Sequence, residues 1–195
     1  MNFRLSSSVI SFMTVCLILL RATLCANALS DTSRWRQVVK ETLESSKSGN
    51  QKAIIVDKSS QKIYLVDGGK LKLSFACICG CNVDQQKMVE GDKVTPEGKY
   101  HITAISNSSG DHYKIMEINY PNNGDRARFA QAKALAKIPR DAKIGRQIQI
   151  QGGLKKSSDC TEGCVVLQNS DIDQLLQYVG IGTPVAIVRI SDQWP

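Results

Sequence analysis

The chain has 195 residues, of which 42% are hydrophobic and 22% charged, and its formal net charge is +7. This length predicts one domain, or one domain with a short appendage, and the apolar fraction is enough for a single core, which excludes wholesale disorder. The basic residues are scattered, and no stripe of aromatic or arginine residues accompanies them, so nucleic-acid binding is not favoured. An anionic cell wall or lipid surface is the partner that this charge favours.

The first 28 residues have the pattern of a cleaved signal peptide. Arg4 precedes an almost wholly apolar run over 9–20, and Ala26-Asn27-Ala28 supplies a small-x-small cleavage signal. The run is shorter than the roughly 20 residues that a transmembrane helix needs, so an uncleaved anchor is the less favoured alternative. Cleavage would leave a mature chain of net charge +5 without a transmembrane segment, secreted across the inner membrane to the periplasm or cell wall.

Residues 29–52 are polar apart from four apolar side chains at helical spacing: Trp35, Val38, Val39 and Leu43. This spacing predicts a short helix that packs on the domain, in preference to a helix that binds a partner, followed by a linker over 45–50.

From residue 53 the pattern changes to short β-rich runs separated by turns. Strands are predicted over 53–57, 62–66, 70–78, 99–105, 113–119, 146–150, 164–167 and 183–190. An alanine-rich helix is predicted over 127–137, and a capping box at Ser170-Asp171-Ile172-Asp173 predicts a second helix through 179. The fold class is therefore mainly β with two inserted helices, a β-sandwich or barrel-like domain over 53–190, followed by a tail over 191–195.

Cysteine usage indicates a reactive or structural thiol cluster. Seven cysteines become five once the two in the signal peptide are removed, and an odd number leaves at least one thiol unpaired in the monomer. Cys77, Cys79 and Cys81 would share one face if their strand continues. Three alternatives stay open: a soft-metal site completed by Cys160, a disulfide from this segment to Cys160, or one structural disulfide with buried thiols.

Cys164 follows a glycine turn and precedes an apolar strand, in the segment Thr161-Glu162-Gly163-Cys164-Val165-Val166-Leu167. A cysteine at such a junction has open space above its sulfur, and neighbouring N–H groups can face a developing oxyanion. Taken alone, the pattern is more typical of a buried packing cysteine.

Five segments occur in a fixed order: GDKVTPEGKY over 91–100, INYPN over 118–122, IQIQG over 148–152, TEGC over 161–164 and GTPV over 182–185. Together they resemble the YkuD-type L,D-transpeptidase family, particularly its ErfK/YbiS/YcfS/YnhG branch. The corresponding family segments are GD-x-x-TPEG-x-Y, NYPN, I-x-I-H-G, D-W-T-x-G-C and GTPV. The likeness covers roughly residues 53–190.

The resemblance implies a cysteine acyltransferase that acts on peptidoglycan tetrapeptide stems. The cysteine attacks the peptide bond before the terminal D-alanine, and an amine of another stem then takes the acyl group. A wall-attached lipoprotein is an alternative acceptor in some relatives, and others hydrolyse such links. No metal or organic cofactor is implied.

Residue by residue, Cys164 matches the family nucleophile, and the N–H of Gly163 would contribute to the oxyanion hole. Gly152 matches the glycine that follows the family's catalytic histidine. Asp159 and Thr161 match the Asp and Thr of D-W-T-x-G-C, as substrate-binding residues or as turn structure.

The chain departs from the family at three positions. Gln151 stands where the family places its catalytic histidine, Glu162 where another branch places a second histidine, and Cys160 where the family has tryptophan. A glutamine amide cannot accept a proton near neutral pH, so general-base help would be missing.

Other groups are candidates for the missing base, and one disulfide would block the nucleophile. Either His101 or His112 would serve if the fold brings it to Cys164, and Glu162 would serve if its pKa is raised. A disulfide between Cys160 and Cys164 would switch the nucleophile off reversibly.

Three classes of function compete. A wall-directed transpeptidase or its hydrolytic relative is favoured, a degenerate family member that binds or trims wall peptides is the rival, and a redox or metal-handling protein rests on the Cys77/Cys79/Cys81 cluster alone.

Overall fold

The computed structural model describes residues 33–107, 113–153 and 159–189. The predicted signal peptide over 1–28 and the predicted tail over 191–195 lie outside these ranges. No helix in the described ranges combines the length and the apolar character that a membrane crossing requires.

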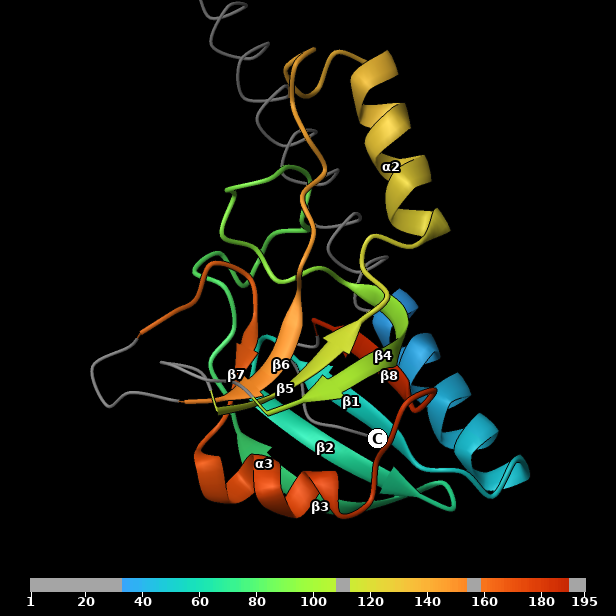
Figure 1. Ribbon diagram of the computed structural model, residues 1–195. Helices are drawn as coiled ribbons and strands as arrows, with labels where there is room; N and C mark the ends of the chain where they lie inside the picture. The colour runs from blue at the N-terminus through green and yellow to red at the C-terminus, as the bar shows by residue number, and fades with distance from the viewer. Residues whose placement is uncertain (1–32, 108–112, 154–158, 190–195) are drawn as a thin grey trace, which may run out of the picture.

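Eight strands form one mixed sheet, in the order β3-β2-β1-β8-β4-β5-β6-β7 (Figure 1). Their bounds are β1 Ala53–Asp57, β2 Lys62–Asp67, β3 Lys70–Ala76, β4 Gly98–Ser106, β5 Tyr113–Ile118, β6 Gln149–Gly152, β7 Val165–Val166 and β8 Pro184–Val188. Two neighbouring pairs, β1 with β8 and β6 with β7, are parallel, and the others are antiparallel.

The sheet bends around one main core. Register shifts interrupt the β4–β5 and β5–β6 pairs, and such irregularities bend a strand and increase its twist. Side chains from both ends of the sheet consequently meet: Ile63 of β2 and Ile150 of β6 are fully buried in the same cluster. This sandwich-like arrangement, with two helices inserted among the strands, confirms the predicted fold class.

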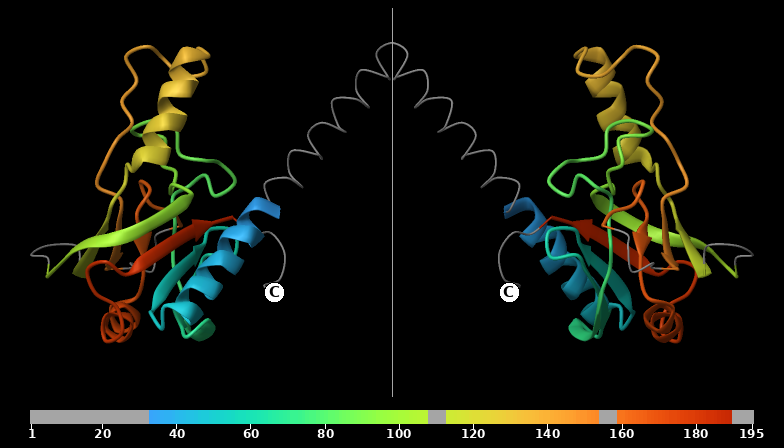
Figure 2. Two further views of the ribbon diagram at one scale, coloured as in Figure 1. Left: turned by 90° about the vertical axis from the view of Figure 1, so that its right-hand side faces the viewer. Right: turned by 90° about the vertical axis from the view of Figure 1, so that its left-hand side faces the viewer.

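The helix over 33–48 covers the other face of β1, β2 and β8 (Figure 2). Its Trp35 and Val39 are buried in a second core cluster with Ile55, Tyr64 and Val188. The predicted helix therefore packs on the domain through the apolar residues that suggested it.

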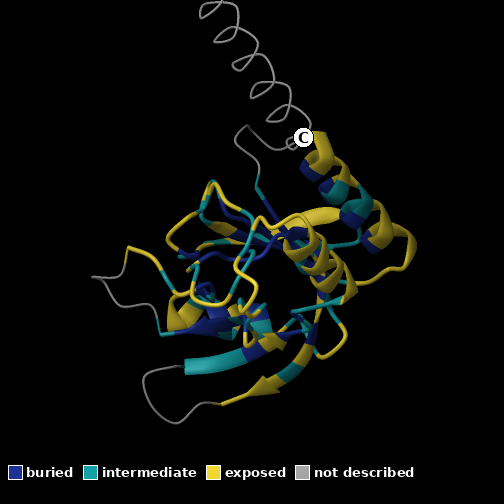
Figure 3. Cartoon of the chain, turned by 90° about the horizontal axis from the view of Figure 1, so that it is seen from above, coloured by how far each residue is buried: buried dark blue, intermediate teal, exposed yellow. Residues whose placement is uncertain are grey.

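The inserted helices differ in how they pack. α2 (Asn123–Ala134) stands off the sheet and is mostly exposed, with only Asp125 and Ala132 buried (Figure 3). α3 (Asn169–Leu176) packs onto the main core through Ile172 and Leu175.

Both helix starts differ from the sequence prediction. α2 begins four residues early, because Asn122 and Asp125 form a reciprocal capping box. The capping box predicted at Ser170 is wrong: α3 follows Gln168 without a side-chain cap, and the Ser170 hydroxyl donates to the Asp171 carboxylate instead, at 3.2 Å.

Candidate active site

Cys164 lies on a glycine turn immediately before β7. Gly163 has φ +123° and is buried, and a Cβ there would lie 2.9 Å from the Val94 carbonyl oxygen and 3.1 Å from Ile148 Cδ1. Only glycine adopts this backbone conformation without strain. The glycine that precedes Cys164 is therefore required by the structure of the turn, independently of any role in catalysis.

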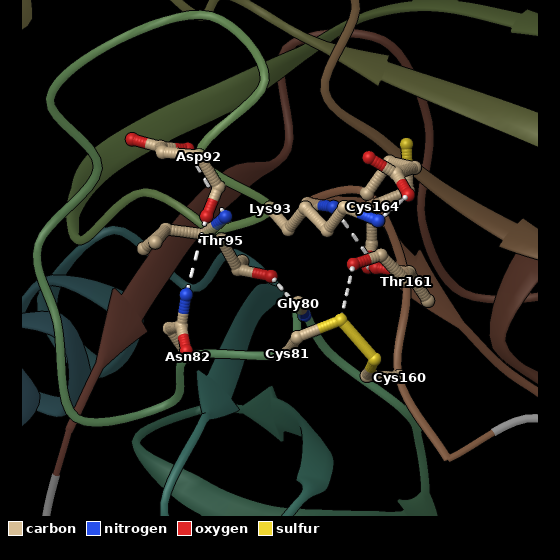
Figure 4. The surroundings of a disulfide bond; sticks show 12 residues. Gly80, Cys81, Asn82, Asp92, Lys93, Thr95, Cys160, Thr161 and Cys164 are labelled. Carbon is tan, nitrogen blue, oxygen red and sulfur yellow. Dashed lines mark hydrogen bonds and ion pairs between the residues drawn. A yellow bond between two sulfur atoms is a disulfide. The ribbon is translucent and has the colours of Figure 1, made fainter.

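The side chain of Thr161 ties this turn together (Figure 4). Its hydroxyl donates to the carbonyl oxygen of Cys164 at 2.6 Å and accepts the N–H of Gly163 at 3.1 Å. Both bonds stay within the turn. In this arrangement the Gly163 N–H is directed at Thr161, so its predicted oxyanion role would need that bond to be exchanged.

A segment far away in the sequence holds the other side of the turn. Ile78 exchanges two backbone hydrogen bonds of 2.9 Å with Val166, and the N–H of Thr161 donates to the carbonyl oxygen of Cys79 at 2.9 Å. β3 ends at Ala76, so the C-x-C-x-C segment does not continue the strand. Cys77 and Cys79 are buried and bond each other through their side chains, whereas Cys81 is exposed.

A disulfide joins Cys81 to Cys160 across 79 residues, with the two Cα atoms 4.7 Å apart (Figure 4). Of the three alternatives, the structure has the disulfide from the C-x-C-x-C segment to Cys160, together with the buried thiols that the third alternative expected. Two alternatives are wrong, because Cys160 is already bonded: it cannot complete a metal site, and it does not pair with Cys164. Cys77 and Cys79 are buried free thiols.

Cys164 lines a pocket of about 210 Å³. The lining residues are Lys87, Glu90, Gly91, Gly145, Arg146, Gln147, Ile148, Glu162 and Cys164. The thiol donates to the carbonyl oxygen of Gln147, with sulfur and oxygen 3.7 Å apart. Burial raises the pKa of this thiol, and the backbone of Gln149 and the charge of Lys87 oppose the rise only in part.

Lys87 brings a positive charge to the pocket that the sequence did not suggest. Its side chain is buried and bonds Asp92 Oδ1 at 2.6 Å. Asp92 also accepts the N–H groups of Met88, Val89 and Val94. Burial raises the pKa of Asp92, but Lys87 and these N–H groups outweigh it and hold the pKa below its usual value. The loop thus fixes a cation beside the candidate nucleophile.

The family model for the L,D-transpeptidase catalytic domain (YkuD) matches residues 51–187. The chain belongs to this family.

Two solved structures share its fold. Bd1075 from Bdellovibrio bacteriovorus is 22% identical with a TM-score of 0.50, and the alignment covers 72% of this chain and 48% of that protein. The helical cell shape determining protein Pgp2 from Campylobacter jejuni is 20% identical with a TM-score of 0.54, covering 73% of this chain and 50% of Pgp2. This chain therefore spans about half the length of either aligned protein. No curated protein sequence matches the chain.

The residue at the family's histidine position lies on the strand beside the turn. Gln151 is buried on β6, in parallel register with Val166, and its carbonyl oxygen accepts the N–H of Leu167 at 2.8 Å. It is not among the residues that line the Cys164 pocket. A Cβ on the next residue, Gly152, would lie 2.7 Å from the Tyr113 carbonyl oxygen, so this family glycine permits close strand packing.

The other predicted residues lie around the site with different surroundings. Glu162 lines the pocket, but its side chain is 73% exposed and bonds Lys93 at 2.8 Å, so it lacks the burial that a base role requires. Asp159 is exposed. His101 is exposed on β4, opposite Pro184 of β8, and does not line the pocket, while His112 lies outside the described residues.

The TPEG segment over 95–98 holds neighbouring parts of the site through two side chains. Thr95 accepts the N–H of Gly80 at 2.8 Å and so holds the cysteine segment. Glu97 is buried and pairs with the fully buried Lys58 at 3.0 Å, and Arg189 lies 3.4 Å from the same carboxylate oxygen. The sequence pattern located this segment but not its partners, because Lys58 and Arg189 are remote in the chain.

Proposed function

We propose that this protein is a peptidoglycan-directed L,D-transpeptidase with Cys164 as its nucleophile. Family membership supports a transpeptidase-like activity at the coarse level. The observation that carries the finer assignment is thiol availability. Among the five cysteines of the described ranges, two form a disulfide, two are buried thiols, and Cys164 is a partly exposed free thiol that lines a pocket.

The proposed reaction has two acyl-transfer steps. The Cys164 sulfur bonds to the carbonyl carbon before the terminal D-alanine of a tetrapeptide stem, and the C–N bond breaks as D-alanine leaves with a proton. An amine then bonds to the same carbon, the C–S bond breaks, and the thiol is restored. The amine belongs to a second stem or, alternatively, to a wall-attached lipoprotein. No cofactor takes part.

The turn geometry supports stabilisation of the oxyanion. Charge develops on the carbonyl oxygen during attack, and a fixed N–H donor that faces it is worth about 10²–10³ in rate. The N–H of Cys164 is the proposed first donor. That of Gly163 joins it if the Thr161 hydroxyl, 3.1 Å away, gives up its hydrogen bond.

Proton handling is where this chain differs from its family. Gln151 cannot act as a base, and the raised pKa of Cys164 keeps the thiol protonated at neutral pH. We therefore propose a slow enzyme whose thiolate forms by loss of the proton to solvent. Losing general-base help costs about 10²–10⁴-fold.

A second candidate function rests on the glutamine at position 151. A member without its histidine would bind wall peptides, or trim them by transfer to water, without efficient cross-linking. Both candidates place the protein outside the inner membrane, after cleavage of the signal peptide predicted over 1–28.

Intact-mass measurement after exposure to a carbapenem tests the proposal. Such β-lactams acylate the nucleophile of this family, so we expect one stable adduct in the wild-type protein and none in Cys164→Ala. An adduct that persists in Cys164→Ala would show that the nucleophile is another residue. Absence of any adduct, with Cys164 shown to be a free thiol, would favour the peptide-binding candidate.

A further inference from the structure

Residues 123–147 form an arm that leaves the sheet after β5 and returns to it at β6 (Figures 1 and 2). The arm consists of α2 and the return segment over 135–147. It contains seven basic and two acidic residues, which gives it a net charge of +5 against +7 for the whole chain. The expectation that the basic residues are scattered is therefore wrong for this segment.

Most of the arm's charge is uncompensated. Arg128 pairs with Asp125. The six remaining basic side chains are exposed and form no ion pair with any described residue: Arg126, Lys133, Lys137, Arg140, Lys143 and Arg146. Lys133 lies over the ring of Phe129, 5.1 Å from its centroid, which leaves its charge intact. Like charges held together in this way repel one another, and a bound polyanion would relieve that repulsion.

The base of the arm is held rigidly against the domain. Asp125 accepts the Tyr100 hydroxyl at 3.0 Å, and Arg128 donates to the Glu97 carbonyl oxygen at 3.3 Å. On the return segment, the Lys143 carbonyl oxygen accepts the Glu90 N–H at 2.8 Å, and the Tyr120 hydroxyl donates to the Ile144 carbonyl oxygen at 2.9 Å. A charged surface fixed at both ends loses less entropy when a ligand binds.

The charges run from the outer end of the arm to the Cys164 pocket. Arg146, at the inner end, lines that pocket together with Cys164. Lys133, Lys137 and Arg140 lie near the outer end, in the last turn of α2 and just after it. Because these cations are spaced along the arm, they suit an extended ligand with distributed negative charge better than a single compact anion.

We propose that this basic arm binds the carboxylate-bearing peptide stems of peptidoglycan and places the wall polymer beside the Cys164 pocket. The inference rests on the proposed function, because it identifies the polyanion by its continuity with that pocket. Every uncross-linked stem ends in a carboxylate, so a wall strand presents repeated negative charges to the arm.

Co-sedimentation with purified, protein-free peptidoglycan sacculi tests this surface. The full chain carries Cys164→Ala so that no turnover occurs, and it is compared with the same chain bearing Lys133→Gln, Lys137→Gln and Arg140→Gln. We expect the apparent Kd to rise about tenfold at low salt, the sum of three exposed charge contacts. The difference should shrink as salt is added.

A matched control removes the same charge elsewhere. Lys47→Gln, Lys62→Gln and Lys70→Gln alter three exposed lysines near the opposite, β2–β3 end of the sheet. This triple variant is expected to bind sacculi as the parent does. Equal weakening by both triple variants would overturn the proposal, because net charge alone would then explain binding.

Two further probes identify the ligand chemistry. Sacculi whose carboxylates have been converted to amides should bind the parent as weakly as untreated sacculi bind the arm variant. Unchanged binding to amidated sacculi, or equally tight arm-dependent binding to vesicles containing phosphatidylglycerol, would overturn the assignment to wall carboxylates. Carbapenem labelling of the wild-type protein is scored separately, so failure of the nucleophile and failure of the arm are distinguishable.

Discussion

The thiol of Cys164 is more basic than an ordinary cysteine thiol in water. Burial raises its pKa, while Gln149 and Lys87 act in the opposite direction. Because only the thiolate is nucleophilic, reactivity should rise with pH up to values above the pKa of a free cysteine. This rise is the expected signature of a nucleophile that works without a base.

The first prediction concerns that pH profile. In the wild-type protein, the rate of Cys164 alkylation by iodoacetamide is expected to keep increasing through pH 8–9. In Lys87→Gln the rate at pH 7.5 should be about threefold lower, because a cation that favours the thiolate is gone. Lys87→Arg keeps the charge and should retain the wild-type profile. A profile that levels off below pH 7 would contradict the raised pKa.

The second prediction concerns the family's histidine position. Gln151→His is expected to increase the rate of acylation and transfer by about tenfold or more, because an imidazole can accept the thiol proton. Gln151→Asn is the matched control and should not increase it. Gln151 is buried and does not line the pocket. An unchanged rate of acylation in Gln151→His would therefore show that the thiol proton must be taken up on the pocket side of Cys164.

At the level of elements, the turn that carries Cys164 depends on the 77–81 segment and on the disulfide beside it. Cys160 is four residues from Cys164, and its bond to Cys81 keeps it from pairing with this proposed nucleophile. We therefore expect the disulfide to protect the Cys164 thiol as well as to hold the turn.

The third prediction separates these two effects. Cys81→Ser frees Cys160, which is expected to pair with Cys164 under oxidising conditions. The mass of the variant should then be about 2 Da below that of its reduced form, and carbapenem labelling should fall at least about tenfold. Cys81→Ser combined with Cys160→Ser should restore labelling, because Thr161 and the Ile78–Val166 bonds still hold the turn. If the double variant remains as inactive as the single one, the disulfide acts by positioning the turn.

Much of this element-level structure is predictable from local pattern. The hairpin strands β1 to β3 and the later strands begin within three residues of the predicted positions, because turn residues and β-branched runs are adjacent in sequence. The start of α2 is four residues earlier than predicted, because Asn122 precedes the alanine-rich run that suggested the helix. For α3 the predicted cap is wrong, because Ser170 bonds its neighbour Asp171. The motif located Cys164, Gly163 and Gln151.

The remainder of the site depends on contacts between distant residues. Nothing local marks Lys87 as the charge beside Cys164, Lys58 as the partner of Glu97, or Cys81 as the partner of Cys160. Each contact appears only when the sheet brings its two segments together.

For the whole molecule, the buried Lys58–Glu97 pair is a polar constraint that links distant segments of the fold. Lys58 also donates to the Gln85 carbonyl oxygen at 2.6 Å, so the pair joins β1's end, the 77–97 loop and the start of β4. Burial lowers the pKa of Lys58, and Glu97 opposes this effect.

The fourth prediction follows from removing one partner. Glu97→Gln should cost about 3–5 kcal/mol, because the charge of Lys58 stays buried without its partner, and should lower Tm by about 10 °C. Lys58→Met should cost less, because Arg189 still lies 3.4 Å from the Glu97 carboxylate. Thermal denaturation of the two single variants and the double variant gives the coupling energy. Single-variant costs that simply add in the double variant would contradict a direct interaction.

The position of β8 in the sheet has a consequence for the order of folding. This strand is the last in the described chain, yet it lies between β1 and β4, where it bonds both. While the chain is being synthesised, β1 can pair with β2, but its other edge and the first half of β4 stay without their neighbour until residues 184–188 emerge. The sheet therefore cannot close across β1 and β4 before synthesis reaches that strand, and until then these two strand edges stay open to solvent or to other chains.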